Sequence, residues 1–352
     1  MEDHELLAMI KQAMEEDASD LHLAVGFPPT LRKNGNLVPL NLSPLRPKDT
    51  ERVAQEIIPS KQAEKLRNSG ECDFSYSLHG LGRFRVSFFR QRGTFSIVMR
   101  IIDRSIPSLD NLGLPPSIEL FTQKNKGLVL VGGPASSGKS TTLAALLEKI
   151  NSDRRAHIIS LENPIEFLHT HNKCIVNQRE IGQDSASFPL ALKSALRQDP
   201  NVIFLGEMRD LETVETVFAA AESGCLIFGV LNSLDVLGTI ERLIEMYPPY
   251  QQHQARIHLA SVLEGIIIQK LLPKNNERGM IAATEVLVGT LEVKSLIKEG
   301  KIEELYGEME KEASHGMQTM DASLKELVEK GLIKAEDAMI NAVNTENFKK
   351  ML

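Results

Sequence analysis

The sequence predicts an α/β protein in which a small mixed α/β domain precedes a parallel-sheet core and a helical C-terminal region. Three observations support this fold class. Near residue 127 a short apolar run leads through a glycine-rich loop into a helical pattern, which is typical of a phosphate-binding loop. Continuous apolar runs then alternate with helical stretches, as in sheets covered on both faces. Within residues 1–104, short runs instead alternate polar and apolar side chains, which favours strands with one exposed face.

Bulk properties narrow the function classes. A length of 352 residues favours two domains. The chain is 42% hydrophobic and 25% charged, and its net charge of −7 argues against nucleic acid as a partner. Cys72, Cys174 and Cys225 are too scattered for a disulfide framework or a CxxC metal site. No apolar run approaches the ~20 residues that cross a bilayer, and the charged residues over 1–20 argue against a signal peptide. We therefore expect a cytoplasmic protein with no direct membrane span.

The first domain shows the pattern of a mixed sheet with helices. Apolar residues at helical spacing over 6–14 predict an amphipathic helix, and alternation over 20–24 predicts a strand. The Asn-Gly-Asn sequence at 34–36 lies between two strand-like runs and predicts a hairpin turn. Residues 73–77 and 83–90 alternate polar with aromatic or aliphatic side chains, as antiparallel strands with one exposed face do.

A linker and a second domain follow. The proline and glycine content of residues 105–116 predicts a linker there. Beyond it, continuous apolar runs predict buried parallel strands at 128–131, 157–161, 202–205 and 226–231. Helical patterns cover 186–198 and 211–223, and after about residue 250 the pattern is helical throughout. The expected segments are a domain over 1–104, the linker over 105–116, a core over 117–285 and a helical region over 286–352.

The phosphate loop is the strongest functional signal. Gly133-x-x-x-x-Gly138-Lys139-Ser140 follows a strand pattern and opens a helical one, which is the order that a P-loop requires. Glycines let backbone N–H groups turn toward a polyphosphate, and the helix N-terminus adds positive charge. Lys139 is expected to contact the β- and γ-phosphates, and Ser140 to ligate Mg²⁺. The expected nucleotide-binding residues are Gly133, Ser136, Ser137, Gly138, Lys139, Ser140 and Thr141.

Two carboxylates are candidates to complete a hydrolytic site. Glu207 follows the apolar run at 202–205, where a Walker B acid meets the Mg²⁺ shell; the alternative is an ordinary glutamate at a strand end. Glu166 follows another predicted strand and could act as general base toward the attacking water. Because glutamates at strand ends are common, the residues alone leave the role of Glu166 open.

Five further motifs occur in order with the P-loop. They are ENPIEF at 162–167, QREIGQD at 178–184, ALRQDPN at 195–201, GEMRDLET at 206–213 and GMQTMD at 316–321. Together they resemble the secretion ATPase superfamily of P-loop NTPases, and within it the type IV pilus retraction ATPases (the PilT/PilU family), over nearly the whole chain. The resemblance implies an N-terminal PAS-like domain, which begins near ASDLHL at 18–23, and a RecA-like ATPase core before the helical C-terminal region.

The resemblance also implies roles for particular residues. Glu166 matches the family's catalytic glutamate, and Glu207 matches the Walker B glutamate that holds Mg²⁺ with Ser140. Family members bring arginines of the N-terminal domain to a nucleotide, and a guanidinium can neutralise charge on a transferred phosphoryl group. The expected catalytic residues are therefore Lys139, Glu166, Glu207, Arg85 and Arg100, with Arg83 and Arg92 as weaker candidates on the same strands.

The implied activity is ATP hydrolysis by a homo-hexamer that retracts type IV pili and so powers twitching motility. The implied cofactors are ATP and Mg²⁺. The implied partners are an inner-membrane pilus platform protein and, optionally, a second retraction ATPase, so the protein would be peripheral to the inner membrane. Extension ATPases carry extra N-terminal sequence and a four-cysteine motif. This chain has three scattered cysteines and its first family motif begins near residue 18, which favours the retraction branch. A DNA-translocating motor is disfavoured, because the sequence shows no basic strip that bears aromatic residues.

Four positions depart from the family pattern. The family's His box usually holds two histidines, and here Cys225 and Asn232 replace them. Asn163 stands in place of an aspartate, and Ser136 stands where relatives commonly have glycine. Asparagine cannot carry the charge that histidine can, which would weaken sensing of the γ-phosphate, and Ser136 would restrict the loop if its φ must be positive. Full activity, a slow accessory paralogue that depends on a partner motor, and loss of hydrolysis all stay open.

Overall fold

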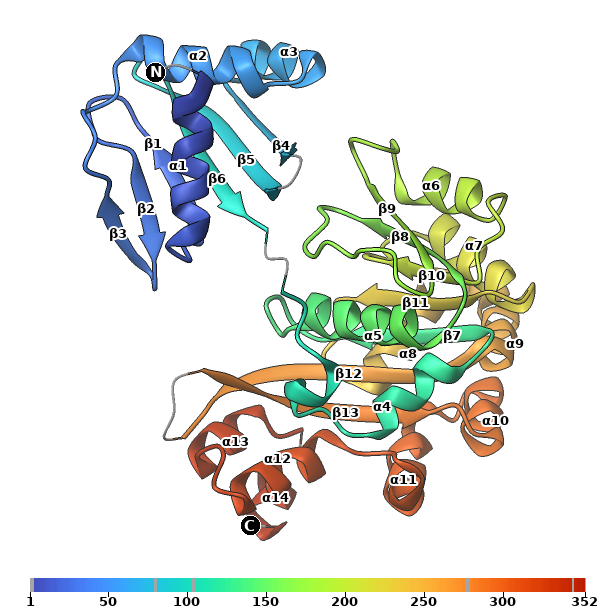
Figure 1. Cartoon of the computed structure of the whole chain (residues 1–352). Helices are drawn as coiled ribbons and strands as arrows, with labels where there is room; N and C mark the ends of the chain where they lie inside the picture. Colours follow the sequence, from blue (N-terminus) through green and yellow to red (C-terminus); the bar gives the residue numbers. More distant parts are fainter. Residues whose placement is uncertain (1–2, 79–80, 103–104, 276–278, 344, 352) are drawn as a thin grey trace. The chain divides into compact units, whose positions relative to one another are not determined.

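The computed structural model describes residues 3–78, 81–102, 105–275, 279–343 and 345–351 (Figure 1). The chain forms two compact units. The first comprises Met1–Arg104 together with Glu166–Leu168, and the second comprises Ser105–Ile165 and His169–Leu352. Each unit combines a β-sheet with helices, so the predicted α/β class is confirmed.

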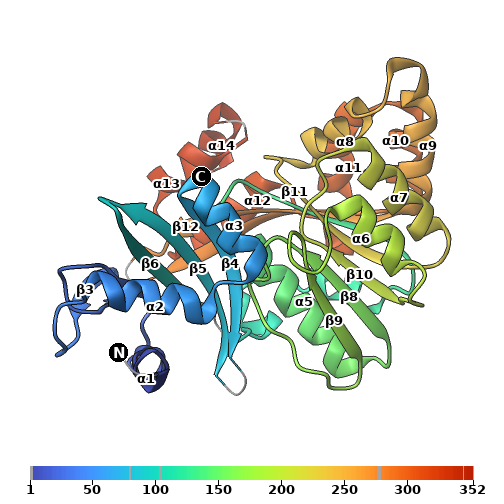
Figure 2. The ribbon, with the colours of Figure 1, turned by 90° about the horizontal axis from the view of Figure 1, so that it is seen from above.

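The first unit is built around a six-stranded antiparallel sheet with strand order β3-β2-β1-β6-β5-β4. Apolar side chains of α1 and α2, such as Ile10 and Val53, share one hydrophobic core with the strands. Figure 2 shows α2 and α3 running across these strands. The elements are α1 (Asp3–Glu15), β1 (Asp20–Leu23), β2 (Thr30–Lys33), β3 (Asn36–Pro39), α2 (Pro47–Ile57), α3 (Ser60–Ser69), β4 (Glu71–Leu78), β5 (Gly82–Gln91) and β6 (Thr94–Ile101).

Two features of this unit follow from local sequence. The predicted hairpin joins β2 to β3, and Asn34 and Gly35 both have positive φ (49° and 82°), as a two-residue turn between twisted strands requires. Along β5, Phe84 and Phe88 are buried while Arg85 is exposed. The predicted alternation therefore gives a sheet with one face in the core and one face in solvent.

The second unit is built around a seven-stranded sheet with strand order β13-β12-β7-β11-β10-β8-β9. The six strands from β12 to β9 run parallel, as the continuous apolar runs predict, and β13 runs antiparallel to β12. The strands are β7 (Gly127–Gly132), β8 (His157–Glu162), β9 (Ile175–Glu180), β10 (Val202–Leu205), β11 (Leu226–Leu231), β12 (Leu263–Pro273) and β13 (Met280–Val288).

Helices cover both faces of this second sheet. Leu128 and Leu130 of β7 pack into a core with α6 to α14, whereas Val129 and Val131 pack into another core with α4 and α5. The helices are α4 (Ser117–Leu120), α5 (Lys139–Asp153), α6 (Phe188–Ala195), α7 (Leu211–Glu222), α8 (Val236–Glu245), α9 (Gln252–Val262), α10 (Leu291–Glu299), α11 (Leu305–Lys311), α12 (Met320–Glu329), α13 (Ala335–Asn341) and α14 (Thr345–Met351). Across the described ranges, no helix has the length and apolar character that a membrane span needs.

The expectation of helices throughout the chain after residue 250 is wrong. The hairpin of β12 and β13 interrupts the helices and completes one side of the sheet. The run Ile266-Ile267-Ile268 is buried, and such a run carries no two-residue alternation that distinguishes a strand from a buried helix. The outer edge of β13 is covered by Gln318, whose backbone exchanges two hydrogen bonds with Val286 (2.8 and 2.9 Å), so the GMQTMD motif closes the sheet.

Candidate nucleotide-binding site

The phosphate loop connects the end of β7 to the start of α5. Gly133 has a φ of 144°, and Gly138, which caps α5, has a φ of 87°, so both positions use the conformational freedom of glycine. A side chain at Gly133 would overlap the carbonyl oxygen of Gln269 and the hydroxyl of Ser137, and a Cβ at Gly138 would lie 2.6 Å from Gln269 Nε2. Close packing against β12 therefore explains both glycines and places the first turn of α5 where it can receive phosphate oxygens.

Gln269 of β12 packs against this loop, although no local sequence pattern predicted it as a site residue. Its side chain is buried, and its Oε1 accepts a hydrogen bond from the Thr142 hydroxyl of α5 (2.7 Å). Its backbone carbonyl faces Gly133 and its amide nitrogen faces Gly138. The available signal was a glutamine directly after a run of isoleucines, but only the register of β12 beside β7 places it against the loop.

The contacts of Lys139 and Ser137 bear on what the loop can bind. The Lys139 ammonium donates to the carbonyl oxygens of Gly133 (2.8 Å) and Pro134 (2.6 Å). Charged phosphate oxygens are stronger acceptors than neutral carbonyls, so a bound polyphosphate can replace these contacts. The Ser137 hydroxyl is buried, and it has no hydrogen-bond partner in the described part of the chain. Both groups therefore suit an anionic ligand.

Ser136 adopts a backbone conformation that favours glycine. It is exposed in the phosphate loop and has a φ of 61°. A left-handed backbone costs a residue that carries a Cβ ~1 kcal/mol relative to glycine. The restriction expected at this departure from the family pattern thus takes the form of local strain in the loop.

The carboxyl ends of the parallel strands lie at the same sheet edge as the phosphate loop, where ligands of open α/β sheets bind. Glu207 follows β10 at this edge; its side chain is 22% exposed and forms an ion pair with Arg209. Ser140 and Thr141 lie half-buried in the first turn of α5. Glu207 and Ser140 are oxygen ligands of the kind that Mg²⁺ prefers, and a bound Mg²⁺ would neutralise charge on the phosphates.

Glu162 ends β8 at this edge and was missed as a site residue. Its Oε1 accepts hydrogen bonds from the Ser160 hydroxyl (2.6 Å) and from Gln178 Nε2 of β9 (3.2 Å). The signal that indicates Glu207, a carboxylate at the end of a buried strand, applies equally to Glu162. Glu166 is exposed and lies in the segment that groups with the first unit. Within the second unit, Glu207 and Glu162 therefore lie at the carboxyl ends of strands that are two and three strands away from β7, and Glu166 is not among them.

Arg85 and Arg100 oppose each other on neighbouring strands of the first unit. Arg85 of β5 pairs in register with Arg100 of β6, and both are exposed. Arg100 Nε donates to Asp20 of β1 (2.9 Å), and Arg32 Nε lies 3.8 Å from the other oxygen of that carboxylate. Burial alone would raise the pKa of Asp20, but hydrogen bonds from Ser19 and Arg100 bring it below its ordinary value. Like charges directly opposite on a strand pair repel, and the Asp20 carboxylate is the anion that offsets this repulsion beside Arg100.

The two His-box positions lie at opposite ends of the same strand, β11. Asn232 follows β11 at the carboxyl edge, is exposed, and accepts a hydrogen bond at its carbonyl from Arg242 Nη1 (2.8 Å). Cys225 precedes β11, so it lies roughly 20 Å from the other end of that strand. Its buried thiol donates to the Pro200 carbonyl (3.3 Å), and burial raises the pKa of that thiol. Within its own chain, Cys225 therefore lies away from the phosphate loop, and the weaker sensing of the γ-phosphate that we expect from the His-box changes concerns Asn232.

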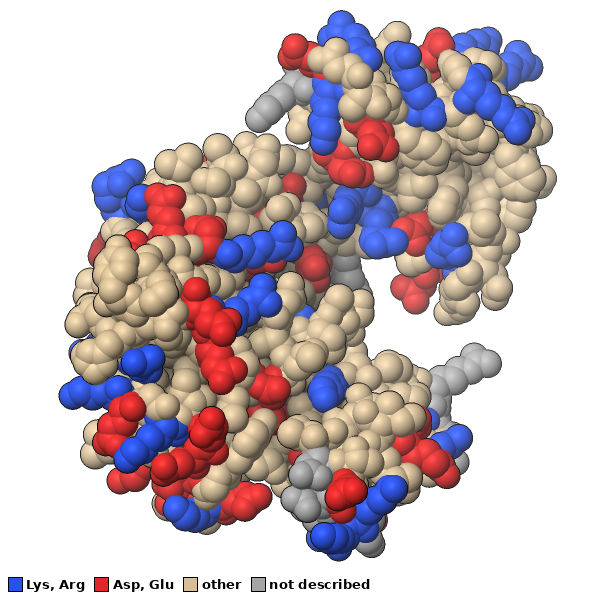
Figure 3. Space-filling view, turned by 180° about the vertical axis from the view of Figure 1, so that it is seen from behind, with Lys and Arg blue, Asp and Glu red and all other residues tan. Residues whose placement is uncertain are grey.

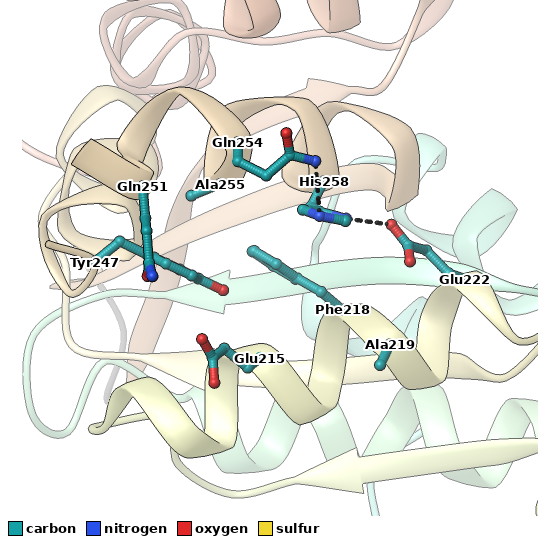
Figure 4. Close-up of a pocket in the computed structure, with 9 residues that line it drawn as sticks. All are labelled: Glu215, Phe218, Ala219, Glu222, Tyr247, Gln251, Gln254, Ala255 and His258. Carbon is teal, nitrogen blue, oxygen red and sulfur yellow. Dashed lines mark hydrogen bonds and ion pairs between the residues drawn. The ribbon is translucent and has the colours of Figure 1, made fainter. Parts of the chain in front are cut away.

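A separate hollow of ≈330 Å³ lies between α7 and α9 (Figure 4). The rings of Phe218 and Tyr247 stack there with centroids 6.4 Å apart, and burial raises the pKa of Tyr247 to about 12. His258 Nδ1 pairs with Glu222 at 2.7 Å. No expected site residue is among its lining residues, which are Glu215, Phe218, Ala219, Glu222, Tyr247, Gln251, Gln254, Ala255 and His258.

Comparisons of this sequence with known proteins point to proteins with ATPase activity. The family model described as type II/IV secretion system protein matches residues 4–295. The chain is 41% identical over 344 residues to the type IV pilus retractation ATPase PilT of Pseudomonas aeruginosa, which covers 98% of this chain and 99% of that protein. It is 37% identical over 344 residues to the type IV pilus ATPase PilU of the same organism, which covers 98% of this chain and 90% of that protein.

Solved structures agree as well. The crystal structure of the pilus retraction motor PilT with bound ADP aligns with a TM-score of 0.91 and 43% identity, and it covers 98% of each chain. The Legionella pneumophila ATPase DotB aligns with a TM-score of 0.83 and 26% identity, and it covers 95% of this chain and 94% of that chain. The resemblance to pilus retraction ATPases that the ordered motifs indicate is thereby confirmed. The chain belongs to the family of type II/IV secretion system proteins.

Proposed function

We propose that this chain is an ATP-hydrolysing motor of type IV pilus retraction, the activity that underlies twitching motility. The observation that carries the proposal is the phosphate loop, with Gly133, Gly138 and Lys139 between a buried strand and a helix, in a chain that aligns over its whole length with a pilus retraction ATPase. A relative of the same fold that holds ADP supports nucleotide binding at this loop.

ATP binding is proposed to replace contacts made within the loop. Lys139 would leave the carbonyl oxygens of Gly133 and Pro134 and donate to the β- and γ-phosphates. Backbone N–H groups at the start of α5 would donate to the same phosphates. Ser140 and Glu207 would hold Mg²⁺, with Glu207 exchanging its ion pair with Arg209 for that role.

Hydrolysis requires a carboxylate that orients the attacking water and accepts its proton. We assign this role to Glu166 because it matches the family's catalytic glutamate. Glu162 is its competitor, because hydrogen bonds from Ser160 and Gln178 hold the Glu162 carboxylate at the carboxyl end of β8, the end of the parallel strands at which the phosphate loop lies. Arg85 and Arg100 would neutralise charge on the transferred phosphoryl group, since both are exposed guanidiniums on neighbouring strands, and Arg100 would exchange its contact with Asp20 for that role.

The proposed working assembly is a homo-hexamer on the cytoplasmic side of the inner membrane. There it would act on a pilus platform protein, with a second retraction ATPase as a further partner. The support for this assembly is the similarity to two proteins of the type IV pilus machinery, which the chain matches over 98% of its length.

Two other functions are not favoured. An accessory subunit with weak activity is suggested by Asn232 and Ser136, but the identity to PilU (37%) is lower than that to the retraction ATPase PilT (41%). Lys139 and Glu207 are also retained. A DNA-translocating motor would need a continuous basic strip, whereas Figure 3 shows basic side chains scattered among acidic ones on the face that it presents.

The test is ATP hydrolysis by the purified chain with Mg²⁺. Lys139→Ala removes the ammonium that binds the phosphates and should lower kcat/KM about 100-fold or more. Cys225→Ala is the matched control, because its thiol lies at the opposite sheet edge, and it should hydrolyse ATP like the wild type. Equal turnover by the wild type and Lys139→Ala rejects the proposed function. Restoration of twitching in cells that lack a retraction motor would then separate a main motor from an accessory subunit.

A further inference from the structure

Glu285 is a buried carboxylate of β13 that the proposed reaction does not use. It is 0% exposed and pairs in register with Ile268 of β12. Ile268 pairs with Gly132 at the base of the phosphate loop, and Gly132 pairs with Leu231 at the end of β11. These four residues form one row across the sheet. Neighbouring strands are ~4.8 Å apart, so the backbone of Glu285 lies about 10 Å from the base of the loop.

The Glu285 carboxylate holds the start of α8. Its Oε1 accepts a hydrogen bond from the N–H of Val236, the first residue of α8, at 2.8 Å in a buried setting. The loop at 232–235, which joins β11 to α8, also lies against the end of β7 at the base of the phosphate loop, because a Cβ at Gly132 would lie 2.6 Å from the Ser233 hydroxyl. A continuous path of contacts therefore runs from the phosphate loop through the loop at 232–235 to Glu285.

The same carboxylate faces the C-terminal helices. The backbone of Met320, the first residue of α12, lies against it and lowers its pKa, as the Val236 N–H does. Tyr306 of α11 is a further neighbour, whose pKa is raised by burial and then by the Glu285 carboxyl. The second oxygen, Oε2, is buried with no hydrogen-bond partner among the described residues. A buried carboxylate is unfavourable unless it is compensated, so its place between the starts of two helices indicates a role in joining them.

We infer that Glu285 is a positioning residue that joins the loop at 232–235 to the start of α12, so that a movement of this loop on nucleotide binding reaches the C-terminal helices. The inference rests on the proposed function only in requiring that a nucleotide binds the phosphate loop. Because Ser233 lies against Gly132, a movement at the base of the phosphate loop displaces the loop at 232–235. The hydrogen bond from Val236 to Glu285 then transmits a displacement of α8 to β13 and to α12.

Charged and titratable groups from several elements surround this carboxylate. Burial raises the pKa of Glu285 to about 7; Asp235 raises it as well, and Lys270 of β12 lowers it. Tyr306 of α11 and Asp321 of α12 belong to the same cluster. The hydrogen bond from Val236 does not depend on the charge, because the oxygen of a neutral acid or amide also accepts an N–H. A glutamine at position 285 should therefore preserve the connection.

The experiment measures hydrogen–deuterium exchange in the full-length chain with and without a non-hydrolysable ATP analogue and Mg²⁺. Glu285→Leu fills a similar volume without an acceptor, and Glu285→Gln keeps an oxygen for the Val236 N–H. In the wild type and in Glu285→Gln, nucleotide should slow exchange both at 232–236 and at the start of α12. In Glu285→Leu the Val236 amide should exchange roughly tenfold faster, and the response of α12 should be lost while the loop still responds.

A second variant removes the donor instead of the acceptor. Val236→Pro lacks the N–H, and proline is tolerated at the first position of a helix. The preceding Asp235 has φ −154° and ψ 174°, which is compatible with a following proline. This variant should uncouple α12 as Glu285→Leu does, and it keeps the test valid if Glu285→Leu fails to fold. Thermal unfolding shows which variants are folded.

Two outcomes overturn the inference directly. One is a response of α12 in folded Glu285→Leu or Val236→Pro that equals that of the wild type. The other is a wild type that binds the analogue without any response of α12. Binding of a fluorescent ADP analogue is measured in parallel, because a wild type that binds no nucleotide rejects the proposed function and the inference together. Binding without coupling rejects the inference alone.

Discussion

The seven-stranded sheet has an amino edge, where its parallel strands begin, and a carboxyl edge, where they end. The two differ in how their polar groups find hydrogen-bond partners. At the amino edge, the Asn201 side chain accepts from the His157 N–H (2.8 Å), and its backbone bonds both the His157 carbonyl (2.9 Å) and the Leu226 N–H (3.0 Å). At the carboxyl edge, the Lys139 ammonium lies on loop carbonyls, and the Ser137 hydroxyl is buried without a partner in the described chain. The amino edge is closed on itself, whereas the carboxyl edge holds groups that a phosphate ligand would satisfy.

This difference separates harmless departures from the family pattern from functional ones. Cys225 lies at the closed amino edge and bonds the Pro200 carbonyl. Ser136 and Asn232 lie at the carboxyl edge, beside the phosphate loop or within it. Changes at the carboxyl edge should alter the chemistry, and changes at the amino edge should alter stability at most.

The largest effect is expected for Glu207→Gln. This change removes a negative oxygen ligand for Mg²⁺ and keeps the side-chain volume, so kcat should fall on the order of 10²–10³-fold at saturating Mg²⁺·ATP. Glu222→Gln, at the C-terminal end of α7 and paired with His258, is a matched control that should keep wild-type turnover in the same steady-state assay. Unchanged turnover of Glu207→Gln would show that Glu207 is not the metal ligand proposed here.

A pair of variants assigns the general base. Glu166→Gln should lower kcat on the order of 100-fold while nucleotide affinity stays unchanged, because the loss affects water activation and not phosphate binding. Glu162→Gln keeps an oxygen for Ser160 and Gln178 and should lower kcat only a few-fold. Single-turnover hydrolysis and binding of a fluorescent ADP analogue measure the two effects. The reverse order of losses would transfer the role of base to Glu162.

The pH dependence of stability tests the buried acid of β13. The folded pKa of Glu285 is raised from 4.5 to about 7, so the folded state binds more protons than the unfolded state between these values. The free energy of unfolding should therefore fall as pH rises from 4.5 through 7, by up to ~3 kcal/mol from this group. Glu285→Gln should lack this part of the slope when urea unfolding is compared at pH 5 and pH 8. Equal slopes for both proteins would contradict the raised pKa.

The smallest effect is expected for Ser136→Gly. Glycine relieves the left-handed backbone at a φ of 61°, so the free energy of unfolding should rise by up to about 1 kcal/mol. The matched control is Ser152→Gly in the last turn of α5, where glycine should instead destabilise by up to roughly 0.5 kcal/mol, because serine has the higher helix propensity. Urea unfolding measures both changes. Destabilisation by both substitutions would show that Ser136 is not strained.

Signals confined to one element predicted most of the fold. The alternation along β5 and the Asn-Gly turn at 34–36 each involve residues within a few positions of one another, and both are confirmed. The hairpin of β12 and β13 was missed, because the buried run at 266–268 lacks the alternation that marks a half-exposed strand. The PAS-like and RecA-like bounds and the catalytic assignments stay predictions.

The sequence by itself determined the phosphate loop, because the required glycines, lysine and hydroxyl lie within eight consecutive residues, from Gly133 to Ser140, and act through their own backbone. Only the tertiary structure decided what lies around it. Gln269 meets Thr142 across 127 residues, and Glu285 meets Val236 across 49, through the register of neighbouring strands. The direction of β11 places Cys225 and Asn232 at opposite edges of the sheet. Such contacts depend on strand order and register, which no local spacing of residues encodes.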